Sequence, residues 1–336
     1  MEKKDSMGIT IKDISKKTGV SYATVSRALN NHPEVNGDTK KRIIKIANEM
    51  EYQPNAIAQG LVKKETKTIG LMIPDITNPF FPEVAIGVEE AASKAGYTVF
   101  LINTNWDEER ELNSFKVLLR KQIDGLIIAP SSENLEHLEN ILNKGIKIVF
   151  LGRKLDYKGS TSIMIDNKIG MYKAVGYLIN KGYKNIAFLG GQKKLSMNQG
   201  RLKGYKNALK DYGLEINEEL IKFDNSKREG GYHLTRKLIE SGLKFSAVVT
   251  VNDLLALGAI QAIKEKGLLI PSDVAIVGFD DIKLASLPEI QLSTVAQPKY
   301  EMGRLAFESL LKQVKGESRV STKVLLEPEL IIRSTT

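Results

Sequence analysis

From residue 68 onward, short apolar runs of strand length alternate with helical patterns, and this alternation constrains the fold more than any other feature. The apolar runs are TIGLMIP at 68–74, TVFLINT at 98–104, DGLIIAP at 124–130, IKIVFLG at 146–152, SIMID at 162–166, NIAFLGG at 185–191, AVVTVND at 247–253 and DVAIVGFDD at 273–281. Helical patterns are expected at 79–95, 107–122, 135–144, 168–181, 201–212, 230–241, 254–266 and 298–315, before a last extended run at 323–334. Strands that are apolar throughout and alternate with helices predict parallel sheets covered on both faces. The stretch is longer than one doubly wound sheet usually needs, so we expect two similar α/β lobes.

The first thirty residues have a different pattern, that of two short helices joined by a tight turn. Residues 10–30 read TIKDISKKTGVSYATVSRALN. Thr10 is a suitable N-cap, and Ile11 and Ile14 fall on one face of the helix that follows. Gly19 provides the backbone freedom that a tight turn needs.

The second of these helices is predicted to have an apolar face and a polar beginning. Ser21 caps it, and Val25, Ala28 and Leu29 face inward. The outward residues near its start are Tyr22, Ala23, Ser26 and Arg27. A recognition helix needs this arrangement, so the pattern predicts duplex DNA as a ligand. An ordinary αα-hairpin with an amphipathic second helix is the alternative.

A third helix and a short uncharged segment follow. The helix is expected from Asp38 or Thr39 to about Glu51, with Ile43, Ala47 and Met50 on its inner face. The segment from Pro54 to Leu61 is too short to hold a helix alone, and Gly60 weakens it by about 1 kcal/mol relative to alanine. Such a segment is suited to becoming ordered on a partner.

Charge is concentrated at the N-terminal end of the chain. The formal net charge is +9, and residues 1–64 contain 12 Lys and Arg against 7 Asp and Glu. More than half of the excess therefore lies on less than a fifth of the 336 residues, as expected of a part that meets phosphates. A solvated surface is the alternative for any single charged run.

Composition excludes several classes of site. The chain has no cysteine, which rules out disulfides and thiolate metal sites, and its three histidines fall in no nucleophile or metal motif. It has no G-x-G-x-x-G or Walker-type loop. We therefore expect no catalytic residues, metal or cofactor, so that an enzyme is a weak alternative. No apolar run has membrane-spanning length, and the start has no secretory apolar region, so we expect a soluble, cytoplasmic protein and no membrane partner.

Several strings together resemble the lactose-repressor/galactose-repressor family of bacterial transcriptional regulators. They are VSYATVSRALN, YQPNAIAQGL, IGLMIPDITNPFF, NDLLALGA and VGFDD, which occur in family order along essentially the whole chain. The resemblance implies a small all-α helix-turn-helix DNA-binding domain and an α/β periplasmic-binding-protein-like core of two doubly wound parallel-sheet lobes. The implied boundaries are 1–53 for the headpiece, 54–66 for the hinge helix and linker, and 67–336 for the core, with an N-lobe at about 67–165 and 292–323 and a C-lobe at about 166–291 and 324–336.

The resemblance also implies partners. Members of the family are homodimers, some of which associate into tetramers, and they bind a pseudo-palindromic operator in the bacterial nucleoid. They respond to a small molecule between the lobes, here expected to be a sugar or sugar derivative that relieves or supports repression. A purine, a sugar phosphate or a protein co-effector is the alternative. A solute-binding transport protein would share the core, but it would leave residues 1–64 without a purpose.

Family positions imply which residues contact DNA. Tyr22 and Ala23 would probe the major groove, and Arg27 would take guanine O6 and N7. Contacts to backbone or sugar would come from Thr10, Ser21, Ser26, Asn30, Thr39, Tyr52 and Asn55. Ala58 and Leu61 would lie in the minor groove, where the paired leucines of a dimer wedge into a central step and kink the duplex. A partly exposed helix aromatic is the alternative for Tyr22, and core packing is the alternative for Leu61.

Effector contacts are implied at six positions, which are Phe80, Phe81, Arg153, Arg201, Asn252 and Asp280. The two phenylalanines would stack on a sugar ring, although first-turn core packing is expected for one of them. Asn252 and Asp280 end strands, where open α/β sheets bind ligands, but either could instead be a helix cap. Arg153 could contact ligand or form an ion pair between the lobes.

The roles of two further residues near this site remain undecided. Gly152 stands where the family often has an acidic residue, which puts one contact to a sugar hydroxyl in doubt. Trp106 ends a strand near the expected cleft and either lines it or caps its own loop.

Overall fold

The computed structural model describes residues 9–52, 65–133, 135, 136, 138, 143, 145–153, 160–317 and 321–336. The chain divides into two compact units, Met1–Thr66 and Lys67–Thr336, and each is described by itself.

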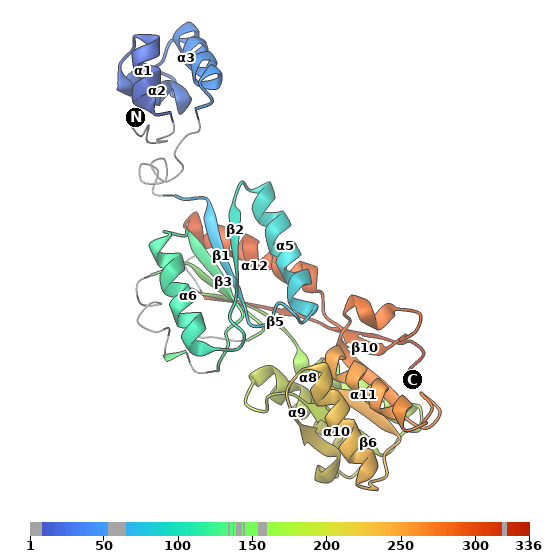
Figure 1. The fold of residues 1–336 in the computed structure, drawn as a ribbon. Coiled ribbons are helices and arrows are strands. Elements are labelled where there is room, and N and C mark those ends of the chain that lie inside the picture. The colour runs from blue at the N-terminus through green and yellow to red at the C-terminus, as the bar shows by residue number, and fades with distance from the viewer. Residues whose placement is uncertain are drawn as a thin grey trace. The chain divides into compact units, whose positions relative to one another are not determined.

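The first unit contains the helices α1 (Ile11–Thr18), α2 (Tyr22–Leu29) and α3 (Gly37–Glu49) (Figure 1). Local hydrogen bonds begin α1 and α2 where the sequence predicts a cap, whereas α3 begins at Gly37, one or two residues before its predicted start, with Asn36 as its cap. The Thr10 backbone N–H donates to the Asp13 carboxylate at 3.0 Å, and the Thr24 N–H donates to Ser21 Oγ at 3.2 Å. Gly19 ends α1 with φ of +70°, a left-handed conformation that favours glycine.

The core of this unit is small and consists of the predicted inner faces. Ile14, Val25, Ala28, Ile43 and Ala47 are buried together. Leu29 and Met50 are partly buried against them, as their helical spacing predicts. The three helices therefore have one apolar face each, which leaves the polar start of α2 at the surface.

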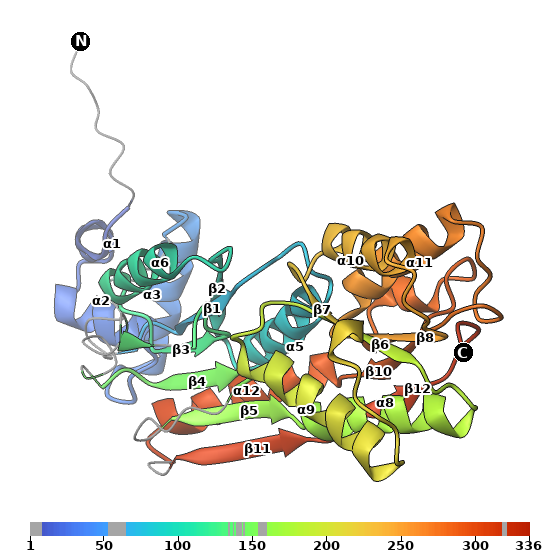
Figure 2. The same ribbon diagram turned by 90° about the horizontal axis from the view of Figure 1, so that it is seen from below.

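The second unit contains two six-stranded sheets, which confirms the prediction of two α/β lobes (Figure 2). In the first sheet the order is β11 (Thr322–Leu326), β5 (Thr161–Ile165), β4 (Ile148–Leu151), β3 (Gly125–Ile128), β1 (Thr68–Ile73) and β2 (Thr98–Asn103). All of its strand pairs are parallel. In the second sheet the order is β12 (Glu329–Ile331), β10 (Ser293–Ala296), β9 (Ala275–Asp280), β8 (Ala247–Thr250), β6 (Ile186–Gly190) and β7 (Ile221–Phe223), and only the pairing of β10 with β12 is antiparallel among these described strands.

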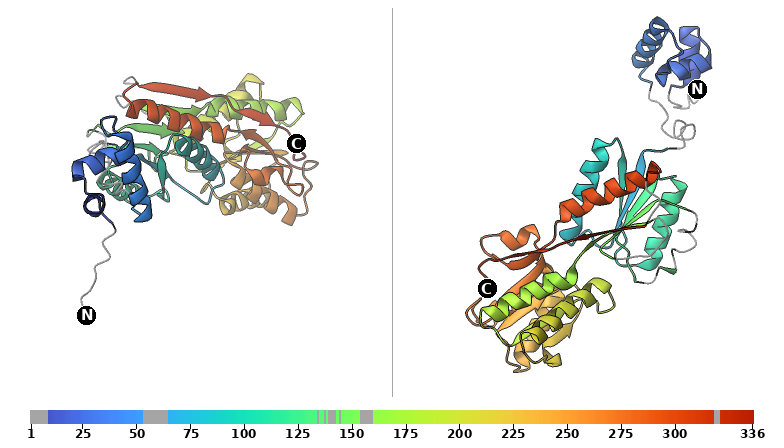
Figure 3. Two further views of the ribbon diagram at one scale, coloured as in Figure 1. Left: turned by 90° about the horizontal axis from the view of Figure 1, so that it is seen from above. Right: turned by 180° about the vertical axis from the view of Figure 1, so that it is seen from behind.

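Helices cover both faces of each sheet, so each lobe has two apolar layers. The first sheet and its helices form the N-lobe, with α5 (Phe80–Lys94) and α12 (Lys299–Val314) on one face and α6 (Glu108–Arg120) on the other (Figure 3). The second sheet and its helices form the C-lobe. There α8 (Asn167–Asn180) and α9 (Ser196–Asp211) lie on one face, and α10 (Arg228–Glu240) and α11 (Asp253–Glu265) lie on the other. Two short 3-10 helices, Glu218–Leu220 and Lys283–Ser286, complete the C-lobe.

The chain passes between the lobes three times, after β5, after β10 and after β11. The second and third crossings differ from the predicted ones near 292 and 324. β10 pairs with β9 in the C-lobe, so this crossing follows Ala296, and β11 pairs with β5 in the N-lobe, so the last crossing follows Leu326. The predicted extended run at 323–334 is therefore two strands in different sheets.

Two other predictions need correction. Helix α9 begins at Ser196, not at Arg201, so Arg201 lies within its second turn. The short strands β7 and β10 were not predicted, because three or four residues give too little apolar periodicity to stand out. Over the residues that the structure describes, every helix is too short or too polar to cross a membrane.

Candidate functional site

The two turns of α2 present three predicted DNA-contacting residues to solvent. Tyr22 is 55% exposed, and Ala23 and Arg27 are also exposed. The Arg27 guanidinium lies 3.9 Å from the Glu34 carboxylate, but both side chains are largely solvated, so this pair holds Arg27 only weakly. The start of α2 is therefore free to enter a groove.

Most of the other predicted backbone contacts of the headpiece lie at or near the ends of its helices, and Ser26 lies in the middle of α2. Tyr52 is half-buried against the headpiece core, and burial, followed by the nearby Tyr22, raises its pKa above the ordinary value. Thr10, Ser21 and Asn30 are exposed, whereas Ser26 and Thr39 are half-buried. Residues 53–64 lie outside the described residues. They include Asn55, Ala58 and Leu61 and most of the hinge helix and linker predicted at 54–66.

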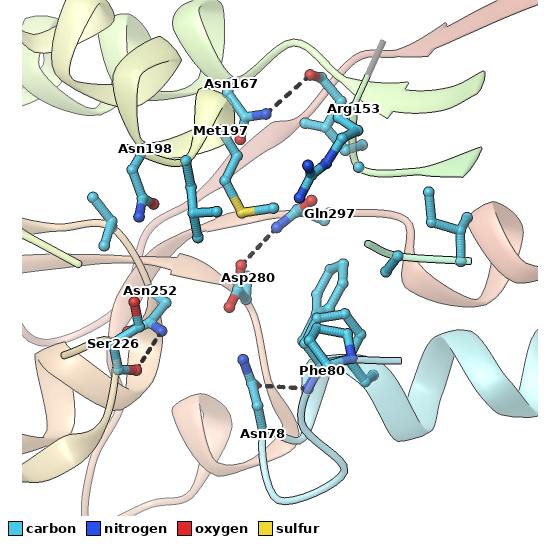
Figure 4. Close-up of a pocket in the computed structure, with 18 of the residues that line it drawn as sticks. Asn78, Phe80, Arg153, Asn167, Met197, Asn198, Ser226, Asn252, Asp280 and Gln297 are labelled. Atoms are coloured by element: carbon cyan, nitrogen blue, oxygen red, sulfur yellow. Dashed lines mark hydrogen bonds between the residues drawn. The ribbon is translucent and has the colours of Figure 1, made fainter. Parts of the chain in front are cut away.

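In the second unit, a pocket lies between the N-lobe and the C-lobe (Figure 4). It contains all six predicted effector-contacting residues, and Trp106 and Gly152 also line it. Asn252 follows the carboxyl end of β8, and Asp280 is the last residue of β9, which is where open parallel sheets place their ligand-binding side chains.

Aromatic side chains from the N-lobe form one side of the pocket. Phe80 and Phe81 begin α5, with ring centroids 5.1 Å apart in an edge-to-face arrangement. Phe81 belongs to the buried N-lobe core, as expected for one of the pair, while Phe80 is half-buried. Trp106 is held in a loop with φ of +58°, a conformation that is uncommon outside glycine.

Arg201 is the buried cation of the C-lobe side. Its Nε donates to Asn167 Oδ1 at 2.8 Å, one terminal nitrogen donates to the Val251 carbonyl, and its guanidinium lies over the Phe279 ring. Burial lowers its pKa to about 10, although Asp280 at 3.9 Å opposes this, so the group stays charged at neutral pH. Among the described residues no partner accepts from its other terminal nitrogen, which leaves that nitrogen for a ligand.

Asp280 is a carboxylate held in an unusual backbone conformation. Its φ is +122°, and Lys299 Nζ donates to its carbonyl at 2.7 Å and to that of Asp281 at 2.6 Å. Gln297 Nε2 donates to Asp280 Oδ1 at 2.6 Å. Burial raises the pKa of Asp280 to about 6, while Arg201 opposes the shift. The carboxylate is therefore ionised at neutral pH and protonated in mild acid.

Asn252 both caps a helix and lines the pocket. Its Oδ1 accepts the Leu255 N–H at 2.9 Å, which begins α11, and its Nδ2 donates to the Ser226 carbonyl at 2.8 Å. Next to it, Asp253 is fully buried, and burial, followed by Asp280, raises its pKa well above the ordinary value. The helix-cap alternative for Asn252 is thus correct without excluding a ligand contact.

Arg153 is buried on the N-lobe side and connects indirectly to the C-lobe. It donates to the Pro130 carbonyl at 2.7 Å and to the Ser132 carbonyl, and it lies 3.7 Å from Glu133. Glu133 Oε1 in turn accepts the backbone N–H of Ser196 at 2.7 Å. The ion pair of Arg153 is therefore within the N-lobe, and it is Glu133 that joins the two lobes.

Several pocket residues were missed by sequence reasoning. They include Asn167 at the start of α8, Met197 and Asn198 on α9, Ser226 before α10, and Gln297 after β10. Gln297 follows β10, which was itself missed, and α9 was predicted to begin after Met197 and Asn198. Asn167 directly follows the strand at 162–166, which was a signal that could have located it.

Together, a helix-turn-helix unit and a two-lobed α/β unit with a pocket between its lobes define the class of ligand-responsive DNA-binding transcription regulators. A family model for "Bacterial regulatory proteins, lacI family" matches residues 10–55. A second model, for "Periplasmic binding proteins and sugar binding domain of LacI family", matches residues 66–334. The chain belongs to the LacI family of bacterial transcriptional regulators.

Individual proteins agree with this assignment over their full length. The HTH-type transcriptional regulator RegA of Clostridium saccharobutylicum is 38% identical, over 98% of this chain and 100% of RegA. Catabolite control protein A of Priestia megaterium is 34% identical, over 98% of this chain and 100% of that protein.

Solved structures show the same fold. The Lac repressor dimer bound to operator and the anti-inducer ONPF has a TM-score of 0.88 and 25% identity, over 98% of this chain and 99% of that chain. The complex of the transcriptional regulator CelR with cellobiose has a TM-score of 0.73 and 27% identity, over 98% of this chain and 100% of that chain.

Proposed function

We propose that this protein is a repressor that binds a pseudo-palindromic operator as a homodimer and is controlled by a carbohydrate in the pocket between its lobes. The observation that carries the proposal is the convergence of Arg201, Asn252 and Asp280 opposite an aromatic wall. Hydroxyl groups of a sugar can accept from the guanidinium and donate to the carboxylate, and its apolar face can stack on aromatic rings.

The relatives support this effector class. The CelR structure is a complex with cellobiose, and the Lac repressor structure contains operator and the anti-inducer ONPF, so proteins of this fold bind small molecules. In this chain, Asp280 Oδ2 accepts no hydrogen bond from a described residue, and one Arg201 nitrogen is similarly unused. These are the atoms we assign to the effector.

On the DNA side, we assign base contacts to Tyr22, Ala23 and Arg27, because they share the exposed first turns of α2. Contacts to phosphate or sugar are assigned to Thr10, Ser21, Ser26, Asn30, Thr39, Tyr52 and Asn55. Ala58 and Leu61 are assigned to the minor groove. Two such headpieces would occupy two half-sites about one helical turn apart.

Exposed apolar side chains on the N-lobe support the homodimer. Phe100 and Leu101 lie on the edge strand β2, and Ile86 lies on α5, which packs beside it. An unpaired edge strand with exposed large side chains is a surface that proteins normally cover. Pairing of two copies would also bring two headpieces to one operator.

Coupling between effector and operator would follow from the lobe arrangement. The carbohydrate increases the population of the lobe arrangement that it binds more tightly. The change in the free-energy difference between the two arrangements cannot exceed the difference between its binding free energies for them. That arrangement sets the separation of the two chain segments that lead to the headpieces, and so it changes operator affinity.

The first experiment is a thermal-shift screen against sugars, sugar acids, sugar phosphates, nucleosides and purines. Each stabilising compound is then titrated against the protein bound to a labelled palindromic operator. The proposal expects a neutral sugar to stabilise the protein and to change operator affinity. Stabilisation by purines or sugar phosphates alone would refute the carbohydrate, and no small-molecule response with tight operator binding would indicate a protein co-effector.

A further inference from the structure

Asp280 and Asp281 form a strained turn at the end of β9. Their φ angles are +122° and +53°, values that residues with a side chain rarely adopt. Such conformations persist only where surrounding contacts hold them. The carboxylate of Asp280 lines the pocket (Figure 4), and its position depends on the turn because the side chain extends directly from the strained backbone.

Two of the bonds that hold this turn come from the other lobe. Lys299 is the first residue of α12, a helix that contributes Met302 and Phe307 to the N-lobe core. Its ammonium donates to the Asp280 carbonyl at 2.7 Å and to the Asp281 carbonyl at 2.6 Å. Successive carbonyls of an extended strand point to opposite sides, so both can accept from one ammonium only while the backbone is turned. The two bonds therefore stabilise the turn and also join the lobes.

The N-lobe holds this ammonium in place. The Lys299 side chain is 6% exposed, and its Nζ lies 3.7 Å from the carboxylate of Glu83 on α5. The helices α5 and α12 are packed to backbone contact, since a Cβ on Gly303 would overlap the carbonyl oxygen of Val84. The buried charge is therefore balanced by a carboxylate of one lobe while it donates to carbonyls of the other.

We propose that Lys299 is a positioning residue for Asp280, which it holds in the conformation that binds the effector. Lys299 lies outside the described lining of the pocket, so it acts through the turn and not on the effector itself. This inference rests on the proposed function and concerns the regulation of the same site. A lobe arrangement that moves the start of α12 away from β9 breaks both bonds and releases the turn. The carboxylate is thus in place only in the arrangement seen here, which gives the effector a reason to prefer that arrangement.

The first test is hydrogen exchange of the full chain without any sugar. Lys299→Met keeps a side chain of similar length but removes the ammonium, so the segment 279–283 should exchange about tenfold faster or more. The amides of Asp281 and Ile282 report this change, because both donate to side chains within the C-lobe. Lys312→Met makes the same substitution at an exposed position of α12 and should leave the segment unchanged.

The second test is isothermal titration with D-ribose, D-glucose, D-galactose and cellobiose. A sugar that binds the unaltered protein should bind Lys299→Met about tenfold more weakly. Asp280→Gly has no carboxylate to position, and glycine adopts the positive φ without strain. In that background Lys299→Met should change the affinity by less than about twofold. A lysine with only a general structural role would not show this non-additivity, and thermal unfolding shows that each variant is folded.

The outcomes separate the positioning role from a general loss of stability and from the proposed function. The role is overturned if segment 279–283 keeps its exchange rate in Lys299→Met, or if exchange rises equally throughout the C-lobe. It is also overturned if Lys299→Met binds the sugar within about twofold of the unaltered protein, or if the loss is the same with and without the Asp280 carboxylate. If none of these sugars binds the unaltered protein, that result counts against the proposed carbohydrate effector, and the exchange measurement, which needs no sugar, still decides the role of Lys299.

Discussion

Replacing Glu133 by alanine removes a contact that joins the two lobes outside the pocket. The Glu133 carboxylate accepts the Ser196 N–H at 2.7 Å and lies 3.7 Å from the Arg153 guanidinium. Ser196 is the first residue of α9, and the residue before it, Leu195, provides no side-chain cap. A carboxylate of the N-lobe therefore caps the C-lobe helix on which Met197 and Arg201 lie.

The magnitude follows from the kind of bond and its exposure. A hydrogen bond to a charged group contributes about 1.5–3 kcal/mol when buried, and a charge at a helix N-terminus contributes about 0.3–1 kcal/mol when exposed. The Glu133 side chain is 37% exposed, so the lower end applies, at about 1 kcal/mol. An effector that needs the two lobes together should then bind about fivefold more weakly to Glu133→Ala.

The assay is isothermal titration with the sugar identified by the thermal-shift screen. Glu133→Gln keeps an acceptor for Ser196 but loses the charge, so its affinity should lie between those of the alanine variant and the unaltered protein. Glu109→Ala, which removes an exposed carboxylate from α6 of the same lobe, should change affinity by less than about twofold. The reasoning is refuted if Glu133→Ala also stays within twofold.

Four further predictions concern the DNA contacts and the pocket. Arg27→Ala should reduce operator affinity by about 1–3 kcal/mol in a fluorescence-anisotropy titration without changing effector affinity, and an unchanged operator affinity would exclude a base contact. Leu61→Ala should weaken operator binding strongly and leave effector affinity intact; full operator affinity would contradict the minor-groove assignment. Arg201→Ala should abolish the response of operator binding to the effector while basal DNA binding remains, and a normal response would remove this residue from the site. Because burial raises the pKa of Asp280 to about 6, its ionised form is lost as the pH falls through 6, so an effector that donates to the carboxylate should bind about tenfold more weakly at pH 5 than at pH 7. A flat profile, or one that Asp280→Asn leaves unaltered, would contradict that last prediction.

The local elements of this protein could be read from its sequence because their signals are local. A cap such as Thr10 or Ser21 acts within three residues of itself, and an apolar run such as residues 68–74 is buried whatever its neighbours. The ends of such runs also located Asn252 and Asp280, since parallel strands bring their carboxyl ends to one edge. This is why the headpiece helices, Asn252 and Asp280 are where the pattern indicates, whereas Arg153 and Arg201 were indicated by the family resemblance and not by a local signal.

Contacts between distant segments could not be read in this way. The placement of β10 in one sheet and β11 in the other depends on which strands they pair with. The sequence of neither strand indicates its partner. Trp106 was undecided between pocket and loop, and Gln297 was missed, for the same reason. The Glu133–Ser196 bond and the approach of Gly152 to Met197 join residues more than forty positions apart, so only the packing of two completed lobes brings these groups together.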